Sequence, residues 1–390
     1  MSDAGRQPSA ADPALSAVVA AARRVVIKVG SAQLIAPDGS GARRDRFEAL
    51  AADIAALRQD DRRVAVVSSG AVAIGRPRLG FKRGDRLSLE QKQACAAAGQ
   101  ARLTQLWDQA LDAHGLAAAQ ALLSPTDTEQ RGRWLNARNT LATLLSLGAV
   151  PVINENDTVA TQELRFGDND RLAARAAQLV GADLLIILSD VDGLYDRDPA
   201  QSGARHIAMV EAVTPQIAAL AGPARPGAGT GGMATKLEAA RLAAAAGCET
   251  IIARGEPGQP IRALLHGARA TLIRAANTPQ NARRAWILGA EPAGAVSVDA
   301  GAAAAVRRGK SLLPAGVTSV VGRFSRGQTV ALLDGDGVEI ARGAAGYDDG
   351  EARAIAGLNS AEIEVRLGYR RGAALIHALD IVLSQPEIDA

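Results

Sequence analysis

Two lysines stand beside glycine-rich turns, where an ammonium group can meet a phosphate. Lys28 interrupts the apolar run 25–29 directly before Gly30, and Lys236 ends the segment GTGGMATK at 229–236. Backbone N–H groups of a glycine turn and a nearby ammonium group bind phosphate oxygens well. Lys28 taken alone also fits an ordinary lysine at the end of a strand. The segment that ends in Lys236 predicts a phosphate cradle.

Polar residues follow two further apolar runs. Ser68 and Ser69 follow RVAVV and precede a helix-like segment, so Ser69 either caps that helix or offers its hydroxyl to an anion. The segment NEND at 154–157 follows AVPVI, and polar groups held at the end of a buried strand need partners. Asp157 is therefore a candidate for receiving a substrate ammonium. The alternative is a polar turn.

The segment FGDND at 166–170 opens a helix-like stretch, RLAARAAQLVG. Asp and Asn at a helix start are ordinary caps, which is one interpretation of Asp168 and its neighbours. In the other, the carboxylates of Asp168 and Asp170 organise Mg²⁺ or phosphate-binding lysines, and Asn169 offers an amide to a substrate.

Two better-known nucleotide motifs are excluded. Gly227, Gly229 and Gly232 have the spacing of a dinucleotide fingerprint, but they follow a loop and not a strand. Gly309-Lys310-Ser311 resembles the end of a P-loop, yet Ala304 stands where the first glycine is required.

Strand and helix signals alternate from about residue 23 to about residue 270, which predicts an α/β fold with a mostly parallel open sheet sandwiched by helices. Ligands of such sheets lie beyond the carboxyl ends of the strands. The polar turns KVGSA, SSGAV, NENDTVA and SDVDGLY should therefore meet at one edge and form a single site. After about residue 280, short strands with frequent glycine turns predict a small β-rich domain.

The bulk composition agrees with two folded domains. Hydrophobic residues make up 48% of 390 residues but aromatics only 3%, so Val, Ile, Leu and Ala must build the core. We expect a disordered tail at 1–20, a first domain at 21–278, a linker at 279–295 and a second domain at 296–385. Two distant cysteines, no apolar run of membrane-spanning length and no signal peptide favour the cytoplasm.

Taken together, the motifs VIKVGS, VVSSGA, PVINENDTVA, FGDND, LSDVDGLY and GTGGMATK resemble the amino-acid kinase family, and specifically its glutamate 5-kinase branch. The C-terminal segments GKSLLPAGV and FSRG resemble the PUA domain that many bacterial members of this branch carry. The resemblance runs from about Arg23 to the end of the chain. It implies ATP-dependent phosphorylation of the side-chain carboxylate of L-glutamate, with ATP and Mg²⁺ as cofactors and no metal ligand assigned to the protein.

The resemblance also assigns residues to roles. Lys28 and Lys236 would be catalytic, with Asp170 holding both lysines in place. Glutamate would be bound by Ser69, Asp157, Asn169 and Asp168. The nucleotide would be bound by Lys28, Ser189, Asp190, Thr230, Gly231, Gly232, Met233, Ala234, Thr235 and Lys236. Ser189 stands where the family commonly has Thr, and it keeps the hydroxyl.

The resemblance further implies a homo-oligomer, feedback inhibition by proline, and a reductase that consumes the labile acyl phosphate in proline synthesis. The nearest alternative is a kinase of the same fold with aspartate or acetylglutamate as acceptor. An RNA-binding protein is a second alternative. Charge argues against it, because residues 296–390 hold 10 Lys plus Arg and 12 Asp plus Glu, a net of −2, and the whole chain carries only +3. We prefer a structural or regulatory C-terminal domain.

Overall fold

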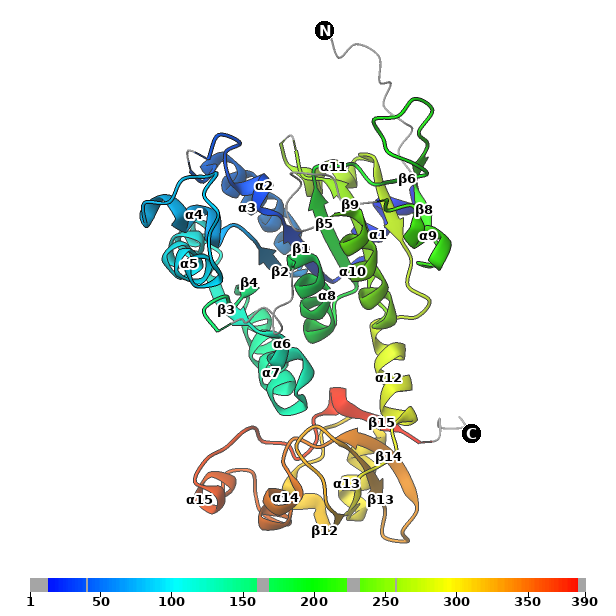
Figure 1. Ribbon diagram of the computed structural model, residues 1–390. Coiled ribbons are helices and arrows are strands. Elements are labelled where there is room, and N and C mark those ends of the chain that lie inside the picture. Colours follow the sequence, from blue (N-terminus) through cyan, green and yellow to red (C-terminus); the bar gives the residue numbers. More distant parts are fainter. Residues whose placement is uncertain (1–12, 40, 160–167, 223–231, 257, 385–390) are drawn as a thin grey trace. The chain divides into compact units, whose positions relative to one another are not determined.

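The protein is described here by a computed structural model that covers residues 13–39, 41–159, 168–222, 232–256 and 258–384 (Figure 1). The chain forms two compact units. The first comprises Met1–Glu129 and Ala137–Pro279, and the second comprises Gln130–Asn136 and Gln280–Ala390. No helix among the described residues is long and apolar enough to cross a membrane.

An eight-stranded sheet forms the centre of the first unit, in the order β3-β4-β2-β1-β5-β9-β10-β8. Its strands are β1 (Arg24–Val29), β2 (Arg63–Ser68), β3 (Ala118–Leu123), β4 (Val150–Glu155), β5 (Leu184–Ser189), β8 (Met209–Val210), β9 (Glu249–Arg254) and β10 (Ala270–Ile273). Every neighbouring pair is parallel except β9 and β10, which run antiparallel. The predicted α/β class with a mostly parallel sheet is confirmed. The antiparallel β10 was not predicted.

The helices of the N-terminal part of the chain lie before and between these strands in the sequence. They are α1 (Pro13–Ala21), α2 (Ser31–Leu34), α3 (Arg44–Gln59), α4 (Ala71–Arg78), α5 (Leu89–Asp112), α6 (Pro125–Glu129), α7 (Arg131–Ser146), α8 (Asn169–Val180), α9 (Pro215–Ala219), α10 (Met233–Ala245) and α11 (Pro260–Leu265). A short hairpin, β6 (Leu194–Tyr195) with β7 (His206–Ile207), follows β5.

Alternation along β1 decides which face of the sheet carries Lys28. Val25, Ile27 and Val29 belong to the apolar core that also contains residues of α1, α3, α5 and α11. Because successive side chains of a strand point to opposite faces, Lys28 lies on the other face. That face is the one on which α8 and α10 pack against each other and against the strands. A lysine in an apolar strand is thus directed at two helix starts.

The predicted disordered tail is wrong for its last residues. Residues 13–21 form α1, and Leu15 and Val19 are buried with exposed fractions of 2% and 1%. These side chains join the same core as α11, so their burial against the domain stabilises a helix that its short sequence would not sustain alone. Residues 1–12 of that tail lie outside the described residues.

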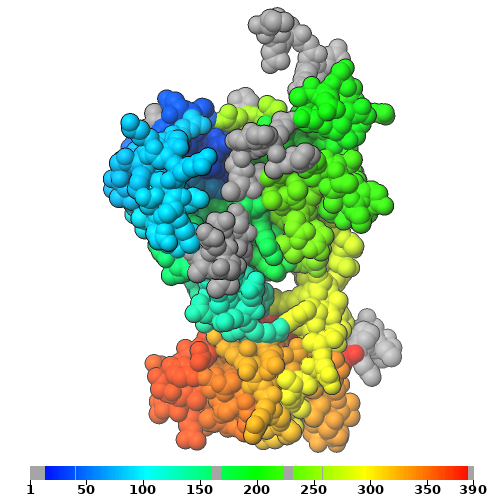
Figure 2. Space-filling model, in the orientation of Figure 1, coloured from blue at the N-terminus to red at the C-terminus, as the bar shows by residue number. Residues whose placement is uncertain are grey.

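Helices α4 and α5 pack unusually closely, and they lie in the light-blue to cyan part of the surface in Figure 2. A Cβ atom added to Gly75 would lie 1.8 Å from the Cys95 carbonyl oxygen, and one added to Gly99 would lie 1.9 Å from the Ala71 carbonyl oxygen. Only glycine permits this approach of two backbones. The contact fixes the start of α4, which directly follows Ser69 and Gly70.

The second unit contains a five-stranded sheet in the order β12-β11-β13-β14-β15. Its strands are β11 (Gly294–Val298), β12 (Val317–Gly322), β13 (Thr329–Leu333), β14 (Glu339–Ala344) and β15 (Ile381–Leu383), and its helices are α12 (Pro279–Gly289), α13 (Ala300–Arg307), α14 (Asp349–Ile355), α15 (Ile363–Leu367) and two 3₁₀ turns, Pro314–Gly316 and Ala378–Asp380. Val330, Leu332, Tyr347 and Ile376 lie in its separate apolar core. Helix α12 occupies most of the segment expected to be a linker.

Candidate active site

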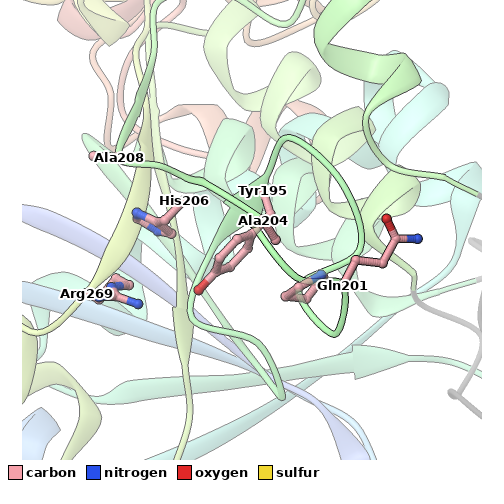
Figure 3. A pocket seen from close by; sticks show the side chains of 8 residues that line it. Tyr195, Gln201, Ala204, His206, Ala208 and Arg269 are labelled. Carbon is pink, nitrogen blue, oxygen red and sulfur yellow. The ribbon is translucent and has the colours of Figure 1, made fainter. Parts of the chain in front are cut away.

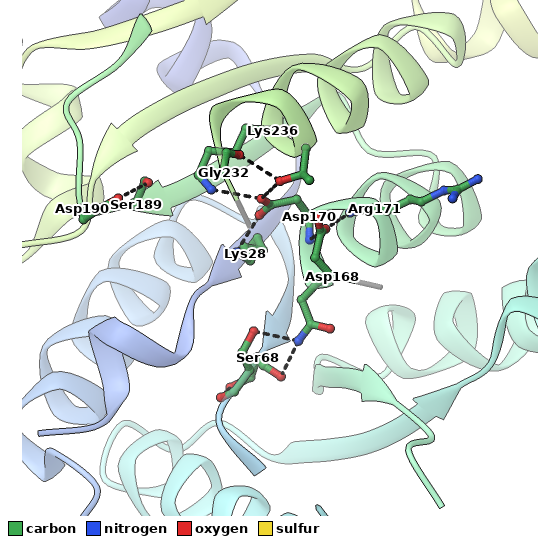
Figure 4. Close-up of polar contacts among 12 residues, drawn as sticks. Lys28, Ser68, Asp168, Asp170, Arg171, Ser189, Asp190, Gly232 and Lys236 are labelled. Carbon is green, nitrogen blue, oxygen red and sulfur yellow. Dashed lines mark hydrogen bonds and ion pairs between the residues drawn. The ribbon is translucent and has the colours of Figure 1, made fainter. Parts of the chain in front are cut away.

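Three charged side chains from three elements meet on the α8 and α10 face of the sheet (Figure 4). The Nζ atom of Lys28 in β1 lies 2.6 Å from Oδ1 of Asp170 in α8. The Nζ atom of Lys236 in α10 lies 3.0 Å from Oδ2 of the same carboxylate. The structure therefore brings together two lysines that are 208 positions apart in the sequence, as predicted, with Asp170 between them.

This lysine–aspartate–lysine cluster is buried and carries an excess of positive charge. The exposed fractions are 0% for Asp170, 7% for Lys28 and 5% for Lys236. Burial acts to raise the pKa of the Asp170 carboxyl, but the charges of the two lysines and their hydrogen bonds outweigh burial and hold that pKa below its usual value. One carboxylate against two ammonium groups leaves a local charge of about +1. Such a site favours an anion.

Helix capping places Asp170 within the first turn of α8. The Asp168 side chain is the N-cap of this helix and accepts hydrogen bonds from the backbone N–H groups of Asp170 (2.8 Å) and Arg171 (3.0 Å). The capping interpretation of Asp168 is thus confirmed. Its predicted contact with a substrate stays a prediction.

The start of α10 is tied to the same carboxylate. Gly232 is the N-cap residue, and the Thr235 hydroxyl lies 2.8 Å from the Gly232 carbonyl oxygen and 3.2 Å from Asp170 Oδ2. The N-termini of α8 and α10 therefore meet at Asp170, and their backbone dipoles add to the positive potential there. Of the expected nucleotide loop, the structure describes Gly232, Met233, Ala234, Thr235 and Lys236, whereas Thr230 and Gly231 lie outside the described residues.

A group of neutral polar side chains adjoins this cluster through Asn169, the residue before Asp170. The Asn169 amide donates to Ser69 Oγ at 2.7 Å, to Asn154 Oδ1 at 2.9 Å and to the Ser68 carbonyl oxygen at 3.3 Å. The capping interpretation of Ser69 is wrong. Gly70, with φ at 112°, is the N-cap residue of α4, and it makes no side-chain capping bond.

Asp157, the remaining residue predicted to bind substrate, follows β4 in a turn and is half-buried. Its contact with a substrate ammonium stays a prediction.

The end of β5 carries the two other residues expected at a nucleotide. Ser189 is buried, and its hydroxyl donates to Asp190 Oδ1 at 2.9 Å. The Ser189 carbonyl oxygen accepts hydrogen bonds from Gln33 Nε2 (3.2 Å) and Gly255 N (2.8 Å). Helix α2 and the end of β9 thus hold the end of β5 in place.

Sequence reasoning missed two residues of α5 whose polar groups lie behind the site. Gln100 accepts a hydrogen bond of 2.9 Å from Asn154 Nδ2, and the Trp107 indole donates to Ser68 Oγ at 2.8 Å. Gln100 and Trp107 are seven residues apart in α5, so they lie on one helical face together with the buried Leu103. A glutamine on that apolar face is the signal that would have found this network.

A separate polar pocket of about 580 Å³ lies beside the β6–β7 hairpin (Figure 3), and its lining includes neither lysine of the cluster. The residues that line it are Tyr195, Pro199, Gln201, Gly203, Ala204, His206, Ala208 and Arg269. Tyr195 donates from its hydroxyl to Asp192 Oδ1 at 2.9 Å. Burial lowers the pKa of His206. The sequence did not predict this pocket.

A protein-held metal does not fit the cluster. Both Asp170 oxygens already face ammonium groups, and no group of three or more His, Cys, Asp or Glu side chains suited to a metal occurs in the described part of the chain. A divalent cation at this site would need most of its ligands from groups outside the protein. Mg²⁺ bound to a nucleotide takes such ligands from the phosphates and from water.

Comparison with known proteins agrees with the geometry. Residues 23–254 match the amino acid kinase family, and residues 294–367 match the PUA domain. The chain is 53% identical over 368 residues to a glutamate 5-kinase of Caulobacter vibrioides (strain NA1000 / CB15N), covering 93% of this chain and 97% of that protein.

Two further relatives are similar over the same span. Glutamate 5-kinase 1 of Rhizobium meliloti is 52% identical over 366 residues, covering 93% of each chain. A glutamate 5-kinase of Paramagnetospirillum magneticum is 51% identical over 367 residues, covering 94% of this chain and 99% of that protein.

Proposed function

Because the chain belongs to the amino acid kinase family, and within it to the glutamate 5-kinases, we propose that it transfers the γ-phosphoryl group of ATP to the side-chain carboxylate of L-glutamate. The products are L-glutamyl 5-phosphate and ADP, and the reaction is the first step of proline biosynthesis. The observation that carries this proposal is the buried cluster of Lys28, Asp170 and Lys236, in a chain that matches named glutamate 5-kinases over nearly its whole length.

The reaction needs positive charge and alignment, not a base. A glutamate side chain has a pKa of about 4.3, so its carboxylate is ionised at neutral pH without help. One carboxylate oxygen attacks the γ-phosphorus, and the bond from that phosphorus to the bridging oxygen breaks as ADP leaves. Both reactants are anions, and charge builds up on the phosphoryl and leaving oxygens during transfer. Preorganised cations in a buried site lower this barrier.

The cluster supplies those cations. Lys28 contacts the phosphates of ATP, and Lys236 stabilises the phosphoryl group in transfer. Asp170 acts as a positioning residue, because each of its oxygens faces one lysine and it is fully buried. Mg²⁺, carried by the nucleotide phosphates, supplies further charge neutralisation, and none of the roles given to these residues depends on it.

The remaining ligand contacts are proposals of the same kind. Ser69, Asp157, Asn169 and Asp168 bind glutamate. Ser189, Asp190 and the segment 230–236 bind the nucleotide. The Asn169 amide is adjacent in sequence to Asp170, so the two ligands would meet at the start of α8.

The cellular setting completes the proposal. The enzyme works as a homo-oligomer in the cytoplasm, where its two buried cysteines stay free thiols. Proline inhibits it as the end product. A reductase consumes the acyl phosphate, because a mixed anhydride hydrolyses readily in water and must be used at once.

Release of ADP tests the function. The purified protein, given ATP and Mg²⁺, should release ADP with glutamate at a rate well above that with aspartate or N-acetylglutamate, and proline should lower the rate. Faster turnover of either alternative acceptor would reassign the substrate. Absence of turnover with all three acceptors would refute the proposal.

A further inference from the structure

The orientation of the Asn169 amide is determined by what surrounds its nitrogen. The Ser68 carbonyl oxygen, 3.3 Å away, can only accept a hydrogen bond, so the atom that faces it must be the NH₂ group (Figure 4). The two protons of that group are shared among three acceptors, of which Ser69 Oγ at 2.7 Å and Asn154 Oδ1 at 2.9 Å are nearer than the Ser68 carbonyl oxygen. Both N–H donors of Asn169 are therefore used within the protein.

A chain of hydrogen bonds continues this polarity into the interior. Since Asn154 presents its oxygen to Asn169, its own NH₂ group faces Gln100 Oε1 at 2.9 Å. Gln100 Nε2 in turn donates to Thr104 Oγ1 at 3.3 Å. Asn154 and Gln100 are buried, with exposed fractions of 3% and 8%. A flip of either amide would place two donors or two acceptors in contact, and these buried groups have no water to satisfy them instead.

This arrangement leaves one acceptor, Asn169 Oδ1, and one donor, the Ser69 hydroxyl, at the outer end of the hydrogen-bond series. No donor to Asn169 Oδ1 is found among the described residues. The Ser69 hydroxyl accepts from Asn169, and its own proton has no acceptor within the same part of the chain. An acceptor beside a hydroxyl donor matches the ammonium group and a carboxylate oxygen of an unmodified α-amino acid. An N-acylated amino acid has no ammonium group to offer.

We propose that Gln100 is a positioning residue that acts through Asn154 to hold Asn169 Oδ1 ready for the substrate ammonium, and that it thereby selects free over N-acylated amino acids. The inference rests on the proposed function, because it concerns the acceptor substrate of the same site. Gln100 itself touches neither substrate nor nucleotide. Its effect is on the orientation of an amide two hydrogen bonds away.

The test compares four variants with the wild type in the ADP-release assay. Gln100→Met keeps the length of the side chain and removes the acceptor for Asn154. Gln100→Glu retains an oxygen in that place. Thr104→Val removes only the last hydrogen bond of the chain, with almost no change in shape. Gln105→Met makes the same replacement at an exposed position of α5 and is the control.

The expected result is a loss of discrimination. Gln100→Met should raise KM for glutamate about tenfold, as for a weakened hydrogen bond to a charged group, and leave KM for ATP within about twofold. The ratio of kcat/KM for glutamate to that for N-acetylglutamate should fall about tenfold. If turnover of N-acetylglutamate is too slow to measure, its Ki as a competitive inhibitor is compared with KM for glutamate instead. Gln100→Glu should restore most of the ratio, and Gln105→Met should match the wild type.

Thr104→Val should shift the ratio in the same direction by about two- to threefold, and it gives the answer if Gln100→Met does not fold. An unchanged ratio in Gln100→Met and Thr104→Val would overturn the inference, as would equal losses for both acceptors or no recovery in Gln100→Glu. In each of these cases wild-type turnover of glutamate would still support the proposed function. A wild type that does not turn over glutamate would refute the function and this inference together.

Discussion

Replacing Asp170 by Asn removes the only negative charge of the lysine–aspartate–lysine cluster and changes little else in shape. The amide oxygen still accepts from one lysine. The other lysine then faces an NH₂ group, and two buried ammonium groups stand together without a counter-charge. The variant should be less stable than the wild type and far less active.

The geometry sets the size of the loss. At separations near those of the two ion pairs, and with an effective dielectric constant of about 20, each pair has roughly 6 kcal/mol of Coulomb attraction, most of which offsets the cost of burying the charges. Removing one partner of a buried pair typically costs about 3–5 kcal/mol. With a slope of about 3 kcal/mol per molar urea, the midpoint of the first unfolding transition should fall by about 1–2 M.

The dependence of the unfolding free energy on pH in the acid range gives a second measure of the Asp170 contribution. The pKa of Asp170 is lowered in the folded protein, so its contribution is complete above the unfolded value of about 3.9 and is lost as pH falls through the folded value. The Asn variant should lack this contribution, and its stability should fall less steeply with acid than that of the wild type.

Urea unfolding followed by circular dichroism measures the loss, with Asp168→Asn as the matched control. Asn caps a helix as well as Asp does, so this neighbouring change should alter stability by less than about 0.5 kcal/mol. ATP should stabilise Asp170→Asn against urea more than it stabilises the wild type, because its phosphates replace the missing negative charge. An Asp170→Asn variant as stable as the control and as active as the wild type would refute the electrostatic reasoning.

Two further predictions concern the frame around the site. Gly99→Ala places a Cβ atom against the Ala71 carbonyl oxygen and should destabilise the protein by more than about 2 kcal/mol in urea unfolding, while Gly80→Ala, where a Cβ meets open space but φ is positive, should cost only about 1 kcal/mol. A smaller effect at Gly99 than at Gly80 would contradict the close helix contact. Burial raises the pKa of Asp53 to about 6 although its carboxylate accepts from Ile261 N. The folded state therefore binds the extra proton between about pH 4 and 6, and this group's contribution to stability falls as pH rises through that window. Asp53→Asn should remove that slope from a pH series of unfolding measurements, and an unchanged slope would show that other groups cause it.

The sheet and the cluster could be predicted because each leaves a local signal. Lys28 is a charged residue in an apolar strand, and Lys236 follows a glycine segment at a helix start. Parallel strands bring such turns to one edge, so chemistry-bearing residues far apart in the chain become neighbours. The position of Asp170 between the lysines came from the resemblance to a family and not from the spacing alone.

The parts that were missed depend on contacts that have no local signature. Residues 13–20 were predicted as part of a disordered tail because a short segment gives no sign that Leu15 and Val19 are buried. Their burial depends on a core built by residues far along the chain. Ser69 reads as a helix cap because the sequence does not reveal that the helix begins two residues later, after Gly70 in a left-handed conformation. Gln100 could not be distinguished from other polar residues of a long helix, because its hydrogen-bond partner Asn154 lies in a strand distant in sequence.

Trapping of the acyl phosphate tests the central claim most directly. Hydroxylamine converts a glutamyl phosphate to a hydroxamate, which separates formation of the acyl phosphate from any ATP hydrolysis. The protein with ATP and glutamate should yield hydroxamate, and folded Lys236→Ala should yield it on the order of 100-fold more slowly, as loss of a charge-stabilising contact in the transition state requires. Hydroxamate formation at the wild-type rate by that variant would contradict the claim that Lys28 and Lys236 together carry the transfer.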